Sequence, residues 1–430
     1  MHMNFNKKSG FSLSAILLVA IIFSLAGHGV ALATGDETYK NLKLFNEVLQ
    51  LVEKNYVEEV DSKEVINSAI NGMIKSLDPH SAFMTAEQFC DLTVNTKGAF
   101  SGLGIVITMQ DNMIVVVSPI EDKPAFLAGV KAGDKIIKIN GKMIKDFSIM
   151  DVVHRLRGKK GTKIAITIIR DGEEAPIDFE IVRDIIEIKS VKQKKYSGDI
   201  GYIRISNFQE TTADELNKAI EEIRAGDVYL KGIILDLRSN PGGLLDQSIR
   251  VADAFLKAGV IVSSRGRTKG SESVYEARYD GNEPECPIII LINGGTASAA
   301  EIVSGALHDN KRAILLGTRT FGKGSVQTVV PLKDGSALKL TIARYYTPDE
   351  KSIQAKGIMP DVVVEYTKPV AVDKGKRKEL REKDLKGHIE AEKEQKGDDK
   401  ADKEMDDFRK DNQLKSAIDL LRSWDFFREI

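Results

Sequence analysis

The pattern of apolar and polar residues divides the chain into a helical region, a β-rich module and a longer α/β region. Between residues 39 and 92, apolar residues recur at three- and four-residue steps, which predicts helices. Residues 97–184 contain short apolar runs separated by glycine turns, with one short helix at SIMDVVHRL. Residues 185–368 alternate strand-like runs such as GIILD and PIIILI with amphipathic helices. This alternation predicts an α/β core with a mixed, largely parallel sheet.

Two further segments complete the expected organisation. Residues 369–410 mix acidic and basic residues with few apolar ones, which is typical of a solvated linker. Residues 411–430 carry apolar residues at helical spacing, which predicts a terminal helix that docks on another part of the protein. The expected segments are therefore 1–33, 34–95, 96–184, 185–368, 369–410 and 411–430.

The first 33 residues have the pattern of an export signal. Lys7 and Lys8 precede an apolar run that ends in Ala31-Leu32-Ala33, a small-x-small cleavage site. The run is close to the ~20 residues that span a bilayer, so cleavage and retention as an inner-membrane anchor both stay open. Either outcome predicts that the bulk of the protein lies in the periplasm or cell envelope.

Charge and cysteine content narrow the function classes. Lys plus Arg (62) and Asp plus Glu (63) nearly cancel, so the sequence gives no indication of nucleic-acid binding. Cys90 and Cys286 are expected to be unpaired thiols. No group of histidines and cysteines has metal-ligand spacing, so neither a metal nor another cofactor is expected.

The β-rich module begins with a glycine loop, Ser101-Gly102-Leu103-Gly104, that runs into a strand. Such a loop can direct successive N–H groups at a carboxylate, while the strand edge pairs with an extended peptide. Glycine turns are common in β modules, but Ala128-Gly129, Gly141 and the apolar-faced helix follow in the order of a PDZ domain. The module resembles a PDZ domain, which implies binding of peptide C-termini through Gly102, Leu103, Gly104 and Ile105.

Ser298, in the stretch NGGTASAAE, has two interpretations. With Glu301 it forms the pattern of a helix capping box. Alternatively, a serine in a tight turn between a buried strand and a helix is an exposed nucleophile, with the Ala299 N–H and the helix N-terminus stabilising an oxyanion. A serine nucleophile needs a base, and His308 lies ~15 Å further along the same helix. The remaining candidate is Lys323.

Lys323 is bracketed by glycines in TFGKGSVQ. A surface lysine in a turn is the ordinary interpretation. A lysine acts as a base only when it is neutral, which requires an apolar setting or a neighbouring positive charge. Gln327 would hold the Lys323 side chain without adding a negative charge.

In combination, these motifs resemble the carboxy-terminal processing peptidases, also called tail-specific proteases, over about residues 38–366. The motifs LDPHS, GLG and DLRSNPGG and the two catalytic motifs occur in the family's order. The resemblance implies an exported serine endopeptidase that cleaves through an acyl-enzyme, with Ser298, Lys323 and Gln327 as the catalytic set. It further implies that a Gly242 N–H is the oxyanion partner of the Ala299 N–H.

The resemblance also implies that Arg157 links the bound substrate tail to the active site. A solvated cation near a helix C-terminus is the plain alternative for this residue. The expected partners are protein or peptide substrates with unstructured C-termini, and a homo-oligomer formed through the N- and C-terminal helices.

Two other functions compete with this interpretation. A non-catalytic PDZ adaptor with a degenerate peptidase core would be favoured by loss of Ser298, Lys323 or Gln327, but all three are intact. An acyl-CoA enzyme that uses the glycine turns as an oxyanion hole fits the α/β layers. It does not fit the export signal or the PDZ-like module.

Overall fold

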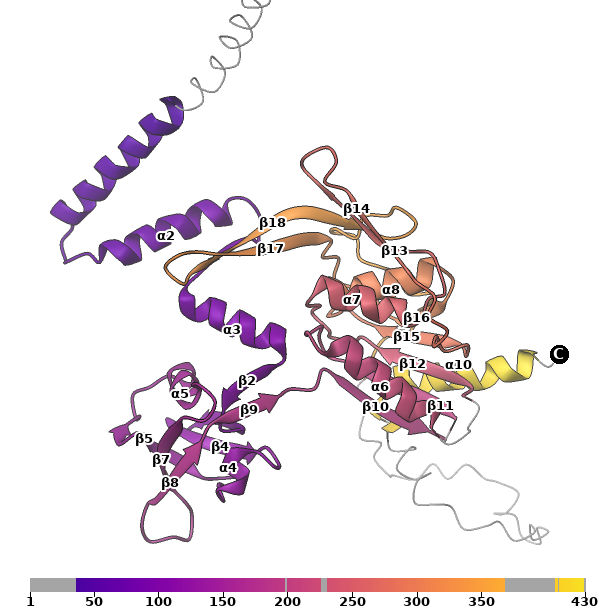
Figure 1. Ribbon diagram of the computed structural model, residues 1–430, viewed down its shortest axis with the longest axis horizontal. Coiled ribbons are helices and arrows are strands. Elements are labelled where there is room, and N and C mark those ends of the chain that lie inside the picture. Colours follow the sequence, from indigo (N-terminus) through magenta and orange to yellow (C-terminus); the bar gives the residue numbers. More distant parts are fainter. Residues whose placement is uncertain (1–35, 198, 226–229, 368–406, 409, 429–430) are drawn as a thin grey trace, which may run out of the picture. The chain divides into compact units, whose positions relative to one another are not determined.

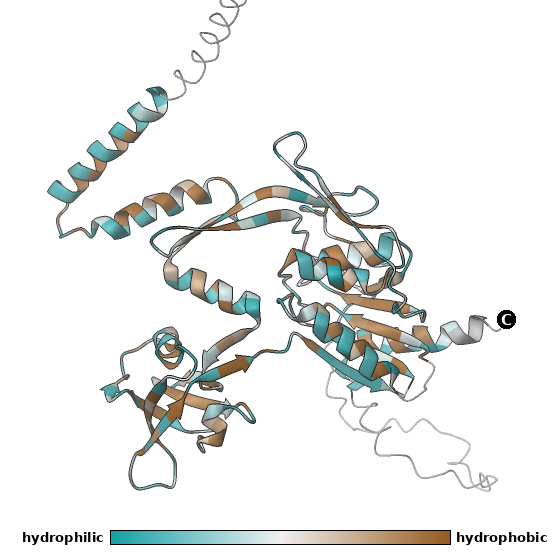
Figure 2. Cartoon of the chain, viewed as in Figure 1, coloured by the Kyte–Doolittle hydropathy of each residue, from teal (hydrophilic) through white to brown (hydrophobic). Residues whose placement is uncertain are grey.

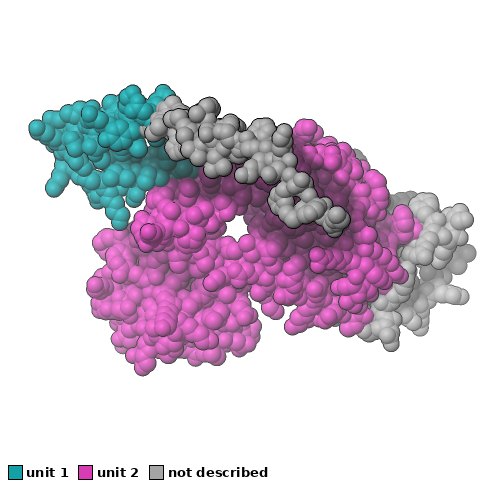
Figure 3. Space-filling view, turned by 45° about the horizontal axis from the view of Figure 1, so that its top comes forward, with its two compact units in different colours: residues 1–79 teal, residues 80–430 magenta. Residues whose placement is uncertain are grey.

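The computed structural model describes residues 36–197, 199–225, 230–367, 407–408 and 410–428. The expected export signal and nearly all of the charged linker lie outside these residues. The chain forms two compact units, Met1–Pro79 and His80–Ile430, which are coloured separately in Figure 3.

The first unit is helical, as the sequence predicts. Residues 36–55 form one helix and α2 spans Ser62–Lys75. The Asp61 side chain begins α2 by accepting hydrogen bonds from the N–H groups of Lys63 and Glu64. The helix over residues 36–55 exposes apolar side chains, including Leu42, Phe45, Val48 and Val52. No helix within the described residues combines the length and apolar character needed to cross a bilayer.

The second unit begins with a strand that the sequence did not predict. Strand β1 (Ala82–Met84) follows the LDPHS motif and precedes α3 (Ala86–Lys97). Thr85 and Gln88 form a capping box at the start of α3, and Gly98 ends the helix at φ +69°, a left-handed conformation that suits glycine.

The PDZ module has an antiparallel sheet in the order β3-β4-β5-β7-β8, with β6 paired to β5. Helix α5 begins with a capping box between Ser148 and Asp151 and buries Val152 and Leu156 against the sheet. The bounds are β3 Ile105–Gln110, β4 Met113–Pro119, α4 Pro124–Leu127, β5 Lys135–Ile139, β6 Lys142–Met143, α5 Ile149–Leu156, β7 Lys163–Ile169 and β8 Ile177–Val182. A separate ribbon pairs β2 (Ala99–Gly102) with β9 (Asp184–Glu187).

A second sheet, in the order β10-β11-β12-β15-β16-β19, forms the centre of the α/β region (Figure 1). Strands β10 and β11 are antiparallel and the other neighbours are parallel, which confirms the predicted mixed, largely parallel sheet. The strands are β10 Val191–Tyr196, β11 Ile200–Ile205, β12 Gly232–Asp236, β15 Ile288–Ile292, β16 Ala313–Gly317 and β19 Val362–Val363.

Helices cover both faces of this sheet. Helices α6 (Thr212–Arg224), α7 (Leu245–Asp253) and α8 (Ala299–Asp309) share one apolar cluster with one face, and α10 (Asn412–Arg428) packs on the other. All residues of β12 and β15 are buried, as expected for parallel strands covered on both sides, and these strands are brown in Figure 2. Helix α10 is docked on the sheet through Leu414, Ala417, Ile418 and Leu421.

An antiparallel sheet stands beside this α/β layer. It contains β1, β18 (Ala337–Tyr346), β13 (Val260–Gly266) and β14 (Ser273–Glu276), and β17 (Ser325–Pro331) also pairs with β18. The strand-like runs VQTVVPL and ALKLTIARYY predict β17 and β18, but the sequence predicts neither β13 nor β14 nor the separate sheet. Pairing between β1 and β18 joins residues far apart in the chain, which local patterns do not reveal.

Candidate functional site

Ser298 lies in the turn between β15 and α8, at the carboxyl end of the parallel strands. Ligand sites in open α/β sheets gather at this edge. The serine backbone has φ +56° and ψ −115°, a conformation that residues other than glycine rarely adopt. Such strain, of about 1–3 kcal/mol, persists only where the surroundings enforce it, and it is concentrated at functional sites.

The loop after β12 lies directly against the serine turn. The Ala297 N–H donates to the Asn240 carbonyl (2.9 Å), and the Thr296 hydroxyl donates to the Leu237 carbonyl (2.8 Å). A Cβ built on Gly242 would lie 2.8 Å from Ser298 Cβ and 2.9 Å from the Ala299 nitrogen. Only glycine therefore fits at position 242, where the backbone lies directly against Ser298 and Ala299.

The Gly242 N–H, however, donates to the Asn240 side chain at 2.9 Å. The Asn240 amide in turn donates to the Ile205 carbonyl (2.9 Å), which fixes the orientation of that side chain. A substrate oxyanion would have to share or replace the Asn240 acceptor. The sequence analysis did not identify this contact, because a buried asparagine in a glycine-rich turn gives no separate signal.

Glu301 joins the serine turn to the lysine loop. Its side chain is fully buried, and one carboxylate oxygen accepts from the N–H groups of Ser298 and Lys323, both at 2.9 Å. The other oxygen accepts from the Thr320 hydroxyl (2.6 Å) and the Gly322 N–H (2.7 Å). The glutamate of the predicted capping box therefore also fixes the loop that carries Lys323, a role that the sequence analysis missed.

Gln327 lies on β17 and is held by hydroxyl groups. Its amide nitrogen donates to the Ser325 hydroxyl at 2.8 Å and to the Thr341 hydroxyl at 3.4 Å. The Thr341 N–H donates to the Ser81 hydroxyl (3.0 Å), so the LDPHS motif supports the strand beside Gln327. Because the amide nitrogen serves these two hydroxyl groups, the amide oxygen is the atom of the Gln327 side chain that can accept a hydrogen bond.

One cleft of about 770 Å³ collects these residues. Its lining includes Ser298, Lys323, Gln327 and Gly242, and no histidine occurs among the described residues that line it. His308 instead contacts Asp309 (2.9 Å) and Asp361 (3.1 Å). The rest of the lining includes apolar side chains that suit an extended peptide, among them Phe89, Leu92, Phe208, Leu244, Leu245 and Tyr345.

A second groove, of about 330 Å³, lies between β3 and α5 of the PDZ module. Its lining contains all five residues that the sequence analysis assigns to tail binding: Gly102, Leu103, Gly104, Ile105 and Arg157. The remaining lining is mainly apolar, with Val106, Ile107, Ile149, Met150 and Val153. The groove is therefore suited to an apolar C-terminal residue.

Arg157 lies at the end of α5 and is half-buried rather than solvated. Its Nη1 donates to the Asp91 carboxylate of α3 at 2.6 Å, and the guanidinium stands 5.2 Å from the centre of the Phe100 ring. His154 of α5 also contacts Glu87 of α3, at 2.9 Å. Other residues of α3, including Phe89, Leu92 and Thr96, line the cleft around Ser298. Helix α3 therefore contributes to both sites.

Other expectations concern thiols and metals. Cys90 and Cys286 are both free thiols, as predicted, and burial raises the pKa of Cys286. Within the described ranges, no group of three or more potential metal ligands comes together.

Comparisons with known proteins identify the class to which this fold and site belong. Residues 199–364 match the model of peptidase family S41, residues 101–181 match a PDZ domain, and residues 28–88 match the N-terminal domain of the activating protease CtpB. The class is therefore a serine-type peptidase that carries a PDZ domain.

The relatives narrow this class. A carboxy-terminal-processing protease of Bartonella bacilliformis is 47% identical over 419 residues, which cover 97% of this chain and 96% of the relative. The carboxy-terminal processing protease CtpA of Bacillus subtilis is 38% identical over 359 residues, 82% of this chain and 76% of the relative. This chain belongs to the carboxy-terminal processing peptidases of family S41.

Among solved structures, the photosystem II D1 C-terminal processing protease is similar, with 30% identity and a TM-score of 0.44. The match covers 75% of this chain and 92% of that protein.

Proposed function

We propose that this chain is an exported endopeptidase that captures the free C-terminal tail of an unfolded protein and cleaves it through an acyl-enzyme on Ser298. The observation that carries this proposal is the single cleft that contains the strained serine, Lys323, Gln327 and Gly242. Its geometry favours a serine-lysine mechanism, since no histidine of the described residues lines that cleft.

In the proposed reaction, neutral Lys323 accepts the proton of the Ser298 hydroxyl while the serine oxygen attacks the scissile carbonyl. The N–H groups of Ala299 and Gly242, with the N-terminus of α8, stabilise the oxyanion. Lys323 then gives its proton to the leaving amine, and the C–N bond breaks. Water attacks the acyl-enzyme with Lys323 again as the base, which releases the acid product and restores Ser298. Gln327 holds the Lys323 side chain through its amide oxygen.

The test is cleavage of an unfolded, tail-bearing protein by the purified chain. Ser298→Ala and Lys323→Ala should each abolish cleavage, and Lys323→Arg should fail as well because a guanidinium stays protonated. His308→Ala is the matched control and should retain activity. Activity should rise with pH, since the base must lose its proton before it acts. Full cleavage by Lys323→Ala would rule out the lysine base, and equal inactivity of wild type and Ser298→Ala would favour the non-catalytic PDZ adaptor.

Substrate selection is proposed to begin in the PDZ groove. The free carboxylate of the tail binds the N–H groups of the loop over residues 101–104, while its last side chain enters the apolar groove. The contact between Arg157 and Asp91 supports a coupling role, because α3 also lines the catalytic cleft. A bound tail that attracts the Arg157 guanidinium would change the contact between Arg157 and Asp91 of α3. The change would then reach the catalytic cleft through α3.

Export, membrane attachment and oligomerisation belong to the same proposal. The N-terminal sequence supports function in the periplasm or cell envelope, with attachment to the inner membrane if the apolar segment is retained. The exposed apolar face of the helix over residues 36–55 supports a homo-oligomer. Helix α10 is less suited to form the homo-oligomer, because its apolar face is already buried against the sheet of the α/β region.

A further inference from the structure

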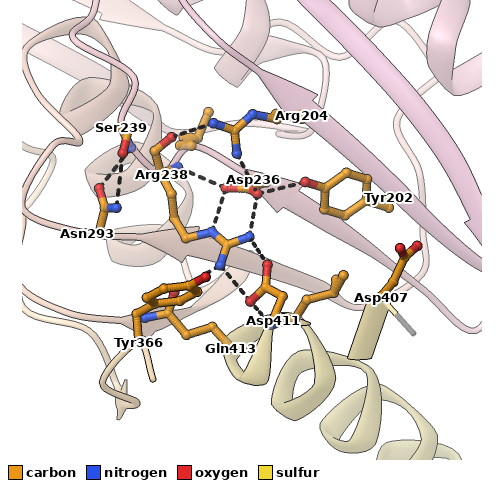
Figure 4. Close-up of polar contacts among 12 residues, drawn as sticks. Tyr202, Arg204, Asp236, Arg238, Ser239, Asn293, Tyr366, Asp407, Asp411 and Gln413 are labelled. Atoms are coloured by element: carbon orange, nitrogen blue, oxygen red, sulfur yellow. Dashed lines mark hydrogen bonds and ion pairs between the residues drawn. The ribbon is translucent and has the colours of Figure 1, made fainter. Parts of the chain in front are cut away.

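Arg238, just beyond the end of β12, uses all five of its N–H donors (Figure 4). Its Nε and Nη2 donate to the two oxygens of Asp236, at 3.0 and 2.7 Å. Nη1 and Nη2 donate to the two oxygens of Asp411, at 2.9 and 2.7 Å, and Nη1 also donates to Gln413 at 2.9 Å. Paired contacts of this kind fix both the position and the plane of a guanidinium.

Three of these five hydrogen bonds go to residues outside the matched peptidase region. Asp411 immediately precedes α10, and its carboxylate also accepts from the Leu414 N–H at 3.0 Å, which caps the helix. Gln413 donates to the Val364 carbonyl at 2.7 Å. Helix α10 is held on the sheet by Leu414, Ala417, Ile418 and Leu421, each at most 4% exposed.

The Arg238 backbone belongs to the loop that supports the serine. The next residue, Ser239, has φ +56°, and its N–H donates to the Asn293 side chain of the serine turn at 2.8 Å. Leu237, immediately before Arg238, and Asn240, two residues after it, accept the hydrogen bonds from the serine turn described above. Two strained backbones, at Ser239 and Ser298, therefore meet in one hydrogen-bonded assembly.

Charge balance explains why the second carboxylate matters. Asp236 is fully buried and already pairs with Arg204 (2.9 Å) as well as Arg238. Two guanidiniums therefore face two carboxylates. Removal of the Asp411 charge leaves Arg238, whose side chain is 10% exposed, to share the single charge of Asp236 with the more exposed Arg204. The Arg238 side chain would then be free to reorient, and the strand-end loop would lose its fixed anchor.

We infer that Asp411 and Gln413 are positioning residues of the peptidase, which act through Arg238 to set the loop over residues 237–243 against Ser298. Helix α10 is thus part of the catalytic assembly, although a long charged segment separates it from the peptidase strands. This inference rests on the proposed Ser298 chemistry. It predicts an effect on turnover and none on capture of the tail.

The test compares Asp411→Asn with wild type on a peptide that carries a free C-terminal tail. Asparagine keeps the size of the side chain and its capacity to cap α10, but it removes the charge and one acceptor. We expect kcat to fall at least tenfold, with KM and tail-peptide affinity within about twofold of wild type. The emission of Trp424, the single tryptophan of the chain, should stay unchanged because α10 remains docked.

The matched control is Asp419→Asn, on the same helix, where the exposed carboxylate pairs only with Lys415. Wild-type kcat in Asp411→Asn, or an equal loss in Asp419→Asn, would overturn the inference. If Asp411→Asn does not fold, Gln413→Ala decides in its place, since a lowered kcat supports the role and an unchanged kcat overturns it. Ser298→Ala, assayed in parallel, separates the two failures. An active Ser298→Ala would overturn the proposed chemistry, whereas an inactive Ser298→Ala together with wild-type kcat in Asp411→Asn would overturn the inference alone.

Discussion

At the scale of single residues, the strained backbone of Ser298 is held by contacts that a capping box alone does not supply. The Ser298 N–H donates to Glu301, and the Ser298 carbonyl accepts from the N–H groups of Glu301 and Ile302. Glu301 also binds the loop that carries Lys323. Its carboxylate therefore fixes the turn that carries Ser298, the proposed nucleophile, relative to the loop that carries Lys323, the proposed base.

Glu301→Gln should lower turnover strongly while the protein stays folded. The amide has one acceptor oxygen, and its NH₂ group would face N–H donors that now meet a carboxylate oxygen. Small displacements of catalytic groups cost on the order of 10²-fold in rate, so we expect a loss of that size. The measurement is the rate of covalent labelling of Ser298 by a fluorophosphonate. Glu276→Gln, at an exposed strand position, is the control, and wild-type labelling in Glu301→Gln would refute the positioning role.

At the scale of elements, α3 connects the two grooves of the second unit. Its Asp91 pairs with Arg157 beside the PDZ groove, and its Phe89 and Leu92 line the cleft around Ser298. A rigid helix with contacts at both places provides a physical route for coupling, provided that tail binding changes one of those contacts.

Capping the substrate tail as an amide should weaken its binding about tenfold. A carboxylate forms charge-assisted hydrogen bonds with the loop N–H groups, each stronger than the neutral bonds of an amide by on the order of 1 kcal/mol. Arg157→Ala should reduce the cleavage rate more than tail affinity, because its proposed role is coupling. The measurements are tail-peptide affinity and cleavage rate for acid and amide tails.

Arg155→Ala removes the same charge from α5 but breaks a contact with Phe147 and leaves the Arg157–Asp91 pair intact, so it serves as the control. Equal binding of acid and amide tails would show that the groove does not recognise a carboxylate. A wild-type cleavage rate in Arg157→Ala would exclude the coupling role.

At the scale of the whole molecule, the buried charges around Asp236 connect pH to stability. Burial alone would raise the pKa of Asp236, but hydrogen bonds and charge from Arg238, with Arg204 and Tyr202, hold that pKa below its ordinary value. A carboxyl group with a lowered pKa in the folded state stabilises the fold above its unfolded value of about 3.9. That contribution is lost as the pH falls through the lower, folded-state pKa.

Acid should therefore loosen α10 below about pH 4. Trp424 reports on this helix, so its emission during denaturant unfolding at pH 7, 5, 4 and 3 gives the measurement. Asp236→Asn should lose about 3–5 kcal/mol at pH 7, because one partner of a buried pair is missing. It should also lose less additional stability than wild type as the pH falls. If the denaturant midpoints of wild type and Asp236→Asn fall equally as the pH is lowered, groups other than Asp236 cause the loss of stability in acid.

Much of this architecture is predictable from local patterns. The apolar runs over β12 and β15 predict buried parallel strands, and a serine after such a strand is therefore expected at the carboxyl edge of the sheet. Glycines 102 and 104 likewise place the PDZ loop. These features depend on residues close together in the sequence, so periodicity and turn chemistry suffice.

The missed features depend on contacts between distant residues. Asp411 follows a highly charged segment and is indistinguishable in sequence from a solvated carboxylate, although it binds a buried arginine. Asp91 carries no separate signal either. Strand β1 has only three residues, too few for a periodic pattern, and its pairing with β18 is set by tertiary packing.

The place of α10 in the sequence also fixes an order of assembly. Chains are synthesised from the N-terminus, and domains begin to fold as they emerge. The strands that carry Ser298 and Lys323 are made before the helix whose Asp411 completes the coordination of Arg238. A nascent chain therefore lacks this contact when the turn that carries Ser298 is first synthesised. On the inference that Asp411 positions the loop against Ser298, full peptidase activity would arise only after α10 has been added.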